Sequence, residues 1–352
     1  MMFSPYFSIT PKITSDLEAI GAVLGYFKAV KLPENYKKEL VSKVTAETVH
    51  SSTAIEGNTL TQGQVDDVLR GKTIVAEKDD IKEVVNYNRA LEYVEILAKE
   101  NTLVTENLIR EINAIVLKDI RSGVGRYRTT QVVVGDYVPP EHWQVPILMR
   151  EFVDWLREPQ PAHLSPILYT GIAHYQLVAI HPFEDGNGRT TRILTTLMLI
   201  QYGYEHSRFF SLESYYNRNR KAYYEALGSA DKYRVGEKAD LTRWLEYYVE
   251  GVLIEATRAK SGIEEMLERA KLTATRAWLS DVQRRMLKLT REKGSAKTAD
   301  YLQVARLSRK GTYNALTKLV ELGLLKRTGA GKGSYYTITE KGLNQTGSNF
   351  QD

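Results

Sequence analysis

The chain contains no cysteine among its 352 residues. This absence excludes disulfide bonds, a thiolate nucleophile and any zinc site with cysteine ligands. No stretch of 18 residues is apolar throughout, so the sequence predicts no membrane-spanning helix and no membrane partner. Residues 1–11 lack a basic segment followed by an apolar core, so we expect no secretory signal and a cytoplasmic protein. The length allows two or three domains.

Charge is divided unevenly along the chain, although the net charge is only +5. Residues 271–352 hold 16 Lys+Arg against 6 Asp+Glu, whereas the other residues hold 32 against 37. A basic module on a mildly acidic body is typical of a separate domain with its own partner. The tail, 344–352, is polar and is expected to be disordered.

The most informative segment begins at His181 and reads His-Pro-Phe-Glu-Asp-Gly-Asn-Gly-Arg-Thr-Thr-Arg. It lies between two apolar runs, 167–180 and 193–202, which are long enough to form buried helices. Gly186-Asn187-Gly188 is therefore expected to be the turn that begins the second helix. The free N–H groups and the dipole at a helix start bind anions, and glycine lets a phosphate approach the backbone closely.

The side chains of this segment have the chemistry that handles a nucleotide phosphate. Arg189 and Arg192 are three residues apart, so they lie on one helix face and can both point at a polyphosphate. Asp185 is the natural Mg²⁺ ligand, because Mg²⁺ usually binds one or two carboxylates together with substrate phosphates. His181 is the natural general base, since a nearby helix N-terminus favours its neutral form. The alternative interpretation is a helix cap with solvated charges around it.

The segment matches, at every position, the pattern His-Pro-Phe-x-Asp-Gly-Asn-Gly-Arg-x-x-Arg, and in this the chain resembles the Fic family. Most enzymes of that family transfer AMP from ATP to a hydroxyl side chain of a target protein. The resemblance implies that His181 deprotonates a Ser, Thr or Tyr hydroxyl, and that Asp185 holds Mg²⁺. Attack on the α-phosphorus then releases pyrophosphate. Relatives that move phosphate instead tend to carry Lys in place of Gly188, which disfavours phosphotransfer here.

Within the motif, the resemblance assigns ATP contacts to the residues that follow the histidine loop. The amides of the glycine turn would cradle the phosphates, and the two arginines would contact the β and γ groups. These expected ATP-binding residues are Asp185, Gly186, Asn187, Gly188, Arg189, Thr190, Thr191 and Arg192.

A second match lies upstream, in Ser52-Thr53-Ala54-Ile55-Glu56-Gly57-Asn58. Gly57 is typical of the residue just past a helix end, which puts Glu56 in the last turn of a helix beginning near Glu34. A negative charge there opposes the helix dipole by about 0.3–1 kcal/mol, so local stability does not explain it. The segment resembles the Ser/Thr-x-x-x-Glu-Gly/Asn inhibitory motif of one class of Fic proteins. There the glutamate pairs with the second motif arginine, here Arg192, and blocks the productive position of the γ-phosphate. An ordinary solvated glutamate is the alternative.

Residues 126–135 are rich in β-branched side chains and lead to Gly135-Asp136, which predicts a strand followed by a hairpin that Pro139-Pro140 closes. The segment resembles the family's flap, which lies over the active site and holds the target protein by strand-like pairing. That resemblance adds Val132, Val133, Val134 and Gly135 to the expected nucleotide site. A purely structural hairpin is the alternative.

The segment Arg220-Lys221-Ala222-Tyr223-Tyr224-Glu225-Ala226-Leu227 resembles the helix that contacts the nucleoside in relatives. Tyr223, Tyr224 and Leu227 are therefore expected at the nucleotide, as is Asp231, although some relatives have Asn at that position. His174 lies seven residues before His181 on the same helix face. No third metal ligand accompanies the pair at a usual spacing, so a buried structural histidine is favoured over a metal site.

The basic end of the chain has the pattern of a winged helix-turn-helix. Helices are expected over 281–292, 298–306 and 309–322, and strands over 324–327 and 334–338. A basic loop joins the two strands and would form the wing. Dimerisation or protein docking through the same small fold is the alternative to DNA binding.

In a DNA-binding version, side chains of the third helix and of the wing would contact the duplex. At the start of the recognition helix these are Ser308, Arg309, Lys310, Thr312 and Tyr313. From the wing, Lys326, Arg327 and Lys332 would reach phosphates.

The sequence thus predicts a mainly α protein: a Fic-type helical bundle with a small β-hairpin flap, followed by a winged helix. We expect an N-terminal region with the inhibitory helix at 1–95, a catalytic core at 96–270, the winged helix at 271–343 and a tail at 344–352. The expected activity is Mg²⁺-dependent transfer of AMP from ATP, autoinhibited by Glu56, and a homodimer is a candidate assembly. Two alternatives stay open: a hydrolase that removes AMP with the same residues, and a DNA-binding regulator whose Fic core senses nucleotide.

Overall fold

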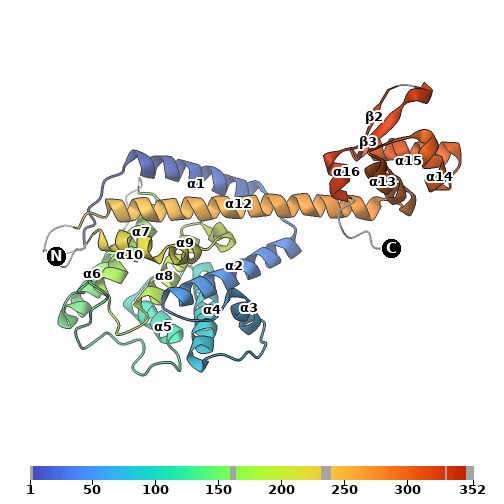
Figure 1. Cartoon of the computed structure of the whole chain (residues 1–352). Coiled ribbons are helices and arrows are strands. Elements are labelled where there is room, and N and C mark those ends of the chain that lie inside the picture. The colour runs from blue at the N-terminus through green and yellow to red at the C-terminus, as the bar shows by residue number, and fades with distance from the viewer. Residues whose placement is uncertain (1–2, 159–163, 231–238, 330, 346–352) are drawn as a thin grey trace. The chain divides into compact units, whose positions relative to one another are not determined.

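The computed structural model describes residues 3–158, 164–230, 239–329 and 331–345 (Figure 1). The chain divides into two compact units, Met1–Gly262 and Ile263–Asp352. None of the described helices has both the length and the apolar character that crossing a membrane requires.

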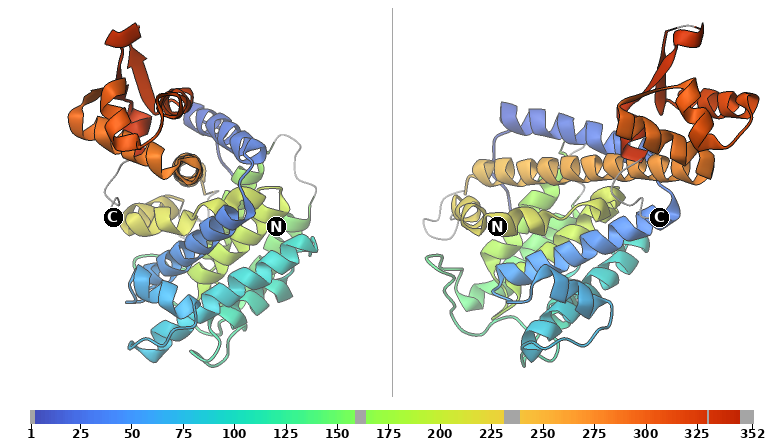
Figure 2. Two further views of the ribbon diagram at one scale, coloured as in Figure 1. Left: turned by 90° about the vertical axis from the view of Figure 1, so that its right-hand side faces the viewer. Right: turned by 45° about the vertical axis from the view of Figure 1, so that its right-hand side comes forward.

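The described part of the first unit is built of α-helices, with two short 3-10 segments at His142–Gln144 and Glu205–Phe209. Helix α8 packs against α4, α5 and α7, while α2 packs on α3, α4 and α9 (Figure 1, Figure 2). The helices are α1 (Pro11–Ala29), α2 (Glu34–Ile55), α3 (Gln62–Leu69), α4 (Lys78–Lys99), α5 (Glu106–Val116), α6 (Val145–Arg157), α7 (Pro166–Ile180), α8 (Asn187–Gln201), α9 (Leu212–Arg218), α10 (Arg220–Gly228) and the first part of α12 (Thr242–Trp278).

Helices α7 and α8 are the buried centre of this unit. Every residue of α7 from Ile167 to Leu177 is buried, as the apolar run predicts, because a helix that is apolar all round has no face for water. Ser165 caps the first turn of α7 by accepting from the N–H of Ile167, and Pro166 occupies the first helical position. The two expected helices on either side of the motif are therefore confirmed.

Helix α12 packs on α7 through its aromatic residues. The indole N–H of Trp244 donates to the carbonyl of Gly171 at 2.8 Å, and the hydroxyl of Tyr248 lies 3.0 Å from Thr170 Oγ1. Trp244, Leu245 and Tyr248 are all fully buried. Because Gly171 has no side chain, the two helices approach closely at this point.

The flap is less regular than the sequence predicts. The turn at Gly135-Asp136 is present, since Val134 and Tyr137 exchange both backbone hydrogen bonds, but residues 126–133 form no strand. Two causes are local. Pro139 and Pro140 lack the N–H groups that a returning strand must donate. On the outgoing side, the guanidinium of Arg128 binds the carbonyls of Thr130 and Pro140, which a strand ladder would otherwise use.

The described part of the second unit places four helices, α13 to α16, against a small antiparallel sheet with strand order β1-β3-β2. Ser295 pairs with Thr337, and Leu325 pairs with Ile338. Strand β1 was not expected, because three residues between two charged helices carry no alternation pattern. The elements are α13 (Asp281–Lys293), β1 (Ser295–Lys297), α14 (Thr298–Ala305), α15 (Arg309–Glu321), β2 (Leu325–Thr328), a 3-10 turn at Gly331–Gly333, β3 (Tyr335–Ile338) and α16 (Glu340–Gln345). Their shared core includes Met286, Leu287, Tyr301, Leu316, Leu319 and Tyr336.

The close approach of α7 and α12 gives a test of the fold. A Cβ at Gly171 would lie 2.8 Å from Cδ1 of Tyr248 and 3.0 Å from Cδ2 of Leu245. We expect Gly171→Ala to lower the free energy of unfolding of the first unit by about 1–3 kcal/mol, the usual cost of overpacking. In α1, Gly21 is exposed, and a Cβ added to it would have nothing within 4 Å, so Gly21→Ala is the matched control. It should leave stability unchanged or raise it slightly. Equal unfolding midpoints in urea for both variants would contradict this packing of α12 on α7.

Candidate active site

The motif forms a tight connection between α7 and α8. His181 ends α7 with left-handed backbone angles, φ 50° and ψ 59°, which are uncommon for a residue other than glycine. Gly186, with φ 76°, precedes α8. Asn187 clamps the loop between them, because its amide donates to the carbonyl of Phe183 and accepts from the N–H of the same residue, both at 2.9 Å. The buried ring of Phe183 anchors the loop in the core.

Asn113 on α5 fixes the same loop from outside the motif, and sequence reasoning missed it. Its Nδ2 donates to the carbonyl of Asp185 at 3.0 Å and to Thr190 Oγ1 at 3.3 Å. Its Oδ1 accepts from the N–H of Gly125 at 3.0 Å. One buried amide thus joins α5, the segment before the flap and the start of α8. The sequence contains no short-range signal for contacts that span 72 and 77 residues.

The environment of His181 keeps its imidazole neutral. Burial, with a smaller effect of the Arg128 charge, lowers the pKa of His181 to about 4, against the opposing influences of a hydrogen bond to Val178 and of the charges of Glu56 and Asp185. One ring nitrogen donates to the carbonyl of Val178, so the other is left as an acceptor. Arg128 also donates to the carbonyl of His181 at 2.9 Å, which ties the flap segment to the histidine. The imidazole is therefore neutral near neutral pH, which is the form that can accept a proton.

Asp185 and Arg189 form an ion pair at the start of α8. Nη2 of Arg189 lies 3.0 Å from Asp185 Oδ1, and Nη1 lies 2.8 Å from Glu83 Oε1 on α4. Arg189 is 3% exposed, so it is committed to these two carboxylates. The other oxygen of Asp185 lies 3.4 Å from Nε of Arg121, and this carboxyl group is 37% exposed.

The residues present fit Mg²⁺ bound in part by a substrate. Within the described ranges, no group of three or more His, Asp or Glu side chains converges as a metal cage. Mg²⁺ does not need such a cage, because one carboxylate combined with phosphate oxygens and water is its common environment in nucleotide sites. Asp185 is a partly exposed carboxylate at a helix N-terminus, where phosphates bind, and so is the residue that would hold the ion.

Glu56 and Arg192 form the ion pair that the sequence predicts. Oε1 of Glu56, the residue that ends α2, lies 2.8 Å from Nη2 of Arg192. Ser52, one turn earlier on α2, accepts from the same guanidinium through its hydroxyl at 2.7 Å and its carbonyl at 3.1 Å. Burial is the largest single influence on the pKa of Arg192 and lowers it, but the charge and hydrogen bond of Glu56, with smaller contributions from Tyr223 and Tyr87, together hold the pKa above its ordinary value. The cation is therefore permanent, although only 1% of its side chain is exposed.

A cavity of about 810 Å³ lies in front of this pair. His181, Gly188, Arg192 and Glu56 line one part of it. The flap contributes Val134, Gly135, Asp136 and Tyr137, and α7 contributes Tyr175, Val178 and Ala179. From α10 come Lys221, Tyr223, Tyr224, Glu225, Leu227 and Gly228.

The structure thus brings together most of the expected nucleotide-site residues, in two different roles. The expected residues that line the cavity are Val134, Gly135, Gly188, Arg192, Tyr223, Tyr224 and Leu227. The others within the motif build the turn and the helix start behind it: Asp185, Gly186, Asn187, Arg189, Thr190 and Thr191. Val132 and Val133 do not line the cavity, and Val133 is 65% exposed. Asp231 lies outside the described residues. Tyr137 and Tyr175 are cavity residues that no sequence pattern indicated.

Comparison with known proteins agrees with this geometry. Residues 103–199 match the model of the Fic/DOC family. The chain contains a Fic domain. A protein adenylyltransferase Fic from Culex quinquefasciatus is 38% identical over 160 residues, which are 44% of this chain and 32% of that protein. Its counterpart from Nematostella vectensis is 35% identical over 201 residues, 55% of this chain and 45% of that protein. The chain therefore spans less than half the length of either relative.

Solved structures show the same fold. A Fic family protein from Desulfovibrio desulfuricans G20 superposes with a TM-score of 0.65 at 25% identity, covering 96% of this chain and 99% of that chain. Fic-1 from C. elegans superposes with a TM-score of 0.58 at 26% identity, covering 74% of each chain. The predicted Fic-type fold is confirmed.

Behind Arg192, the first unit contains a directed chain of buried hydrogen bonds. Arg192 donates to the hydroxyl of Tyr223, and that hydroxyl lies 3.0 Å from His174 Nε2. His174 Nδ1 lies 3.0 Å from Oγ1 of Thr195, which itself donates to the carbonyl of Thr191. Because the hydroxyl proton of Thr195 is already donated to Thr191, the neutral His174 donates from Nδ1 to Thr195 and accepts at Nε2. Burial, with a smaller effect of Arg192, lowers the pKa of His174 to about 3, so it stays neutral.

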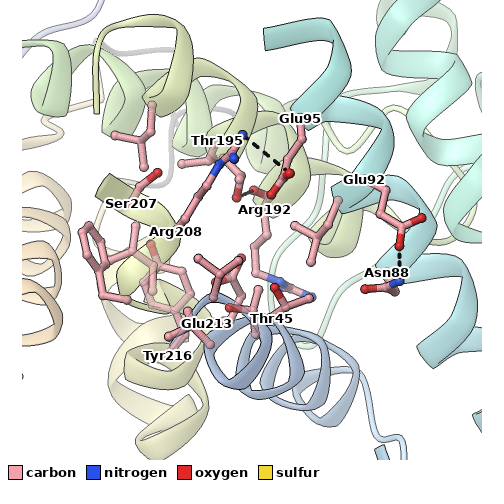
Figure 3. A pocket seen from close by; sticks show the side chains of 18 of the residues that line it. Thr45, Asn88, Glu92, Glu95, Arg192, Thr195, Ser207, Arg208, Glu213 and Tyr216 are labelled. Carbon is pink, nitrogen blue, oxygen red and sulfur yellow. Dashed lines mark hydrogen bonds and ion pairs between the residues drawn. The ribbon is translucent and has the colours of Figure 1, made fainter. Parts of the chain in front are cut away.

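A second cavity, of about 200 Å³, lies between α2, α4, α8 and α9 (Figure 3). Thr45 of α2 and Arg192 both line it, and across it Glu95 of α4 lies 3.5 Å from Arg208 (Figure 3). Arg192 thus borders both cavities. The middle of α2 borders this cavity, and the last residues of the helix, Ser51–Ile55, are buried.

The role of Asn113 can be tested without any assay of activity. Asn113→Ala would leave the carbonyl of Asp185 and the N–H of Gly125 without partners, so we expect the free energy of unfolding to fall by about 2–4 kcal/mol. On the same helix, Asn107 makes only an exposed hydrogen bond to Glu111, so Asn107→Ala is the matched control and should change stability by less than about 0.5 kcal/mol. Urea denaturation followed by tryptophan fluorescence measures both. Similar small effects would show that the loop does not depend on Asn113.

Proposed function

We propose that the protein transfers AMP from ATP to a hydroxyl side chain of another protein. The observation that carries this proposal is that one cavity is lined by a neutral histidine, by the N-terminal turn of α8 at Gly188 and by the buried cation Arg192. Relatives named protein adenylyltransferase Fic, which are 35–38% identical over the matched part, support it.

In the proposed reaction, the free ring nitrogen of His181 takes the proton of a target Ser, Thr or Tyr hydroxyl. The hydroxyl oxygen then attacks the α-phosphorus of ATP, and pyrophosphate leaves. The N–H groups at the start of α8 and Arg192 hold the phosphates, since a helix N-terminus and a guanidinium both favour anions. When bound at Asp185, Mg²⁺ would neutralise part of the phosphate charge. Tyr224 and Leu227 would offer an apolar wall to the adenine.

We also propose that Glu56 holds this activity low. Its carboxylate occupies the guanidinium of Arg192 that a γ-phosphate would use, and a Cβ at Gly188 would collide with Oε1 of Glu56, so the carboxylate fills the space in front of the helix start. Keeping an enzyme 99% inactive requires only about 2.7 kcal/mol. A partly buried ion pair is worth up to ~4 kcal/mol before desolvation, and its net value is smaller. A single carboxylate is therefore sufficient.

Removal of Glu56 is the first test. We expect Glu56→Gly to form an AMP adduct on itself or on lysate proteins, at least tenfold faster than wild type, as read by intact-mass spectrometry after incubation with Mg²⁺-ATP. The adduct should vanish when His181→Ala is added. Glu100→Gly is the matched control, because Glu100 also ends a helix with similar backbone angles, φ −81° against −85°, and lines neither cavity. It should behave as wild type.

An absence of adduct in Glu56→Gly would contradict simple inhibition and favour one of the two alternatives. If the protein removes AMP, wild type should strip a modified target that Glu56→Gly leaves intact, since Glu56 would then position water. If the core only senses nucleotide, neither variant should change the target, although ATP would still bind. An adduct that persists with His181→Ala would contradict the role of the histidine as base.

The pH dependence of the transfer follows from the pKa of His181. A base works only when neutral, and a pKa of about 4 keeps His181 neutral at all higher pH values. Removing Glu56 removes an influence that raises this pKa, so it falls further in Glu56→Gly. We expect kcat/KM of Glu56→Gly for Mg²⁺-ATP, which reports the pKa of the free enzyme, to change less than about twofold between pH 7.5 and 5.5. A histidine with an ordinary pKa near 6.5 would lose about tenfold over this range. Nucleotide affinity of the His181→Ala double variant, measured at each pH, separates binding from proton transfer.

For the second unit, we propose a winged-helix module. Its order, α13-β1-α14-α15-β2-β3, places two helices before the candidate recognition helix α15 and a strand pair after it. The compact units divide between Gly262 and Ile263, whereas the expected domain boundary at 271 lies further along α12. The expected homodimer stays a prediction.

A further inference from the structure

Arg128 is a buried arginine that is bound only by uncharged groups. It is 2% exposed, and burial lowers its pKa. In the described part of the chain its side chain donates to the carbonyls of His181, Thr130 and Pro140 and to the amide oxygen of Gln131. None of these acceptors is a carboxylate, so close charge pairing does not offset the cost of taking the cation out of water. What the guanidinium contributes is the planar arrangement of its donors, which fixes several groups at once.

The carbonyls that Arg128 binds belong to two different parts of the active site. Nε donates to the carbonyl of His181 at 2.9 Å, where α7 ends. Nη1 donates to the carbonyl of Thr130 at 3.2 Å, on the outgoing side of the flap. Nη2 donates to the carbonyl of Pro140, on the returning side. One rigid guanidinium therefore joins both sides of the flap to the histidine that is the candidate base.

Two further hydrogen bonds hold the flap against the same part of the chain. The backbone N–H of Arg128 donates to the carbonyl of Pro182 at 2.9 Å. Near the tip of the flap, the hydroxyl of Tyr137 donates to the carbonyl of Ala179 at 2.6 Å. The flap is thus tied at its base and near its tip to the last turn of α7 and to the residues that follow it.

The carbonyl of His181 belongs to a residue whose backbone needs support. Its left-handed angles, φ 50° and ψ 59°, are held in a residue other than glycine only where the surroundings determine them. In this conformation His181 lines the cavity beside Gly188 and Arg192. The contact with Nε of Arg128 therefore helps to keep the imidazole directed at the place where phosphates are expected.

Arg128 can influence a reaction only through the groups that it holds. It is not among the residues that line the cavity of about 810 Å³, whereas His181 and the flap residues Val134, Gly135 and Tyr137 are. The expected role is therefore to position those groups, without direct contact with the nucleotide.

We propose that Arg128 is a positioning residue for the AMP transfer, which holds the flap at a fixed distance from His181. This inference rests on the proposed function and deepens it. A target segment that lies along the flap is then placed so that its hydroxyl oxygen reaches both the free ring nitrogen of His181 and the α-phosphorus. Lysine would keep the charge of Arg128, but its single ammonium group cannot hold the three carbonyls in the same geometry.

The test compares Arg128→Lys with its parent, Glu56→Gly, in the full chain. At saturating Mg²⁺-ATP, we expect adduct formation on the protein itself or on lysate proteins to slow by at least about tenfold, since small misplacements of reacting groups are costly. The Kd for Mg²⁺-ATP, measured by calorimetry with His181→Ala added, should change by less than about twofold, with the full number of binding sites. A variant that was partly unfolded would lose binding sites as well as rate.

Arg110→Lys is the matched control. Nε of Arg110 also donates to a backbone carbonyl, that of Gly125 at 2.7 Å, and its guanidinium lies over the ring of Tyr127. Neither contact joins the flap to His181, so the adduct rate should stay within about twofold of the parent.

Gln131→Ala is a second variant with little risk to the fold, because Gln131 is exposed. Its Oε1 accepts from Nη1 of Arg128 at 3.3 Å, and its Nε2 donates to the carbonyl of Pro139 at 2.9 Å. Its loss loosens the base of the flap but leaves the contact with His181 in place. We therefore expect a smaller decrease in rate, about threefold, as the loss of one ordinary hydrogen bond gives.

Hydrogen–deuterium exchange without nucleotide tests the attachment of the flap independently of AMP transfer. The N–H groups of Val134 and Tyr137 are hydrogen-bonded to each other's carbonyls. Arg128→Lys in the wild-type background should speed exchange in peptides that span 128–141 by at least about tenfold and leave α4 unchanged, because only the flap is released. Arg110→Lys should leave both unchanged.

An adduct rate for Arg128→Lys within about twofold of its parent would overturn the proposal. Loss of Mg²⁺-ATP binding in step with the rate would overturn it as well, because Arg128 would then support the fold and not the position of the flap. No adduct in the parent Glu56→Gly would refute the AMP transfer itself. An active parent combined with unchanged exchange in Arg128→Lys would refute only the positioning role, so the two failures are distinguished.

Discussion

The ion pair between Glu56 and Arg192 is the contact on which the active site depends. Arg192 is almost completely buried, and a buried cation without a partner would destabilise the fold strongly. Both of its partners on α2, Ser52 and Glu56, lie one turn apart, so a single helix satisfies the cation. Within the proposed mechanism, the helix can release Arg192 only when another anion replaces it. A triphosphate is such an anion, so in this mechanism the inhibitory Glu56 and the nucleotide compete for Arg192.

The polar chain behind Arg192 explains why the cation does not disrupt the core. Tyr223 accepts from the guanidinium and donates onward to His174, so no proton donor is left facing another donor. A charged residue in the place of His174 would add a second buried positive charge. The lowered pKa of His174 shows that burial and Arg192 both disfavour that charge. A neutral histidine accepts a hydrogen bond at one ring nitrogen and donates to Thr195 from the other, without adding a charge to the interior.

Local patterns predicted the parts of this site that neighbouring residues determine. The apolar run of α7, the glycine turn before α8 and the helix end at Glu56 all follow from signals within a few residues. The contacts that these elements make with distant parts of the chain do not follow from such local signals. Arg189 pairs with Glu83, which lies 106 residues away, and Arg128 reaches a carbonyl 53 residues away, and neither has a periodicity to reveal it. The flap differs from its predicted strand for the same reason. A β-branched segment forms a strand only when it pairs with another strand, and the returning segment cannot pair because its prolines lack N–H groups.

Gly188 shows how a motif residue can serve two functions. From the sequence, its expected role is to let a phosphate approach closely. Its backbone is helical, so any residue could adopt its conformation, and only space requires glycine there. That space is occupied by the carboxylate of Glu56, because a Cβ would meet both Oε1 of Glu56 and Nη1 of Arg192. A side chain at this position would therefore displace the end of Glu56 and, within the proposed mechanism, crowd a phosphate as well. Glycine at 188 therefore lets the Glu56–Arg192 pair keep its present geometry, since a Cβ there would force one or both side-chain ends to shift.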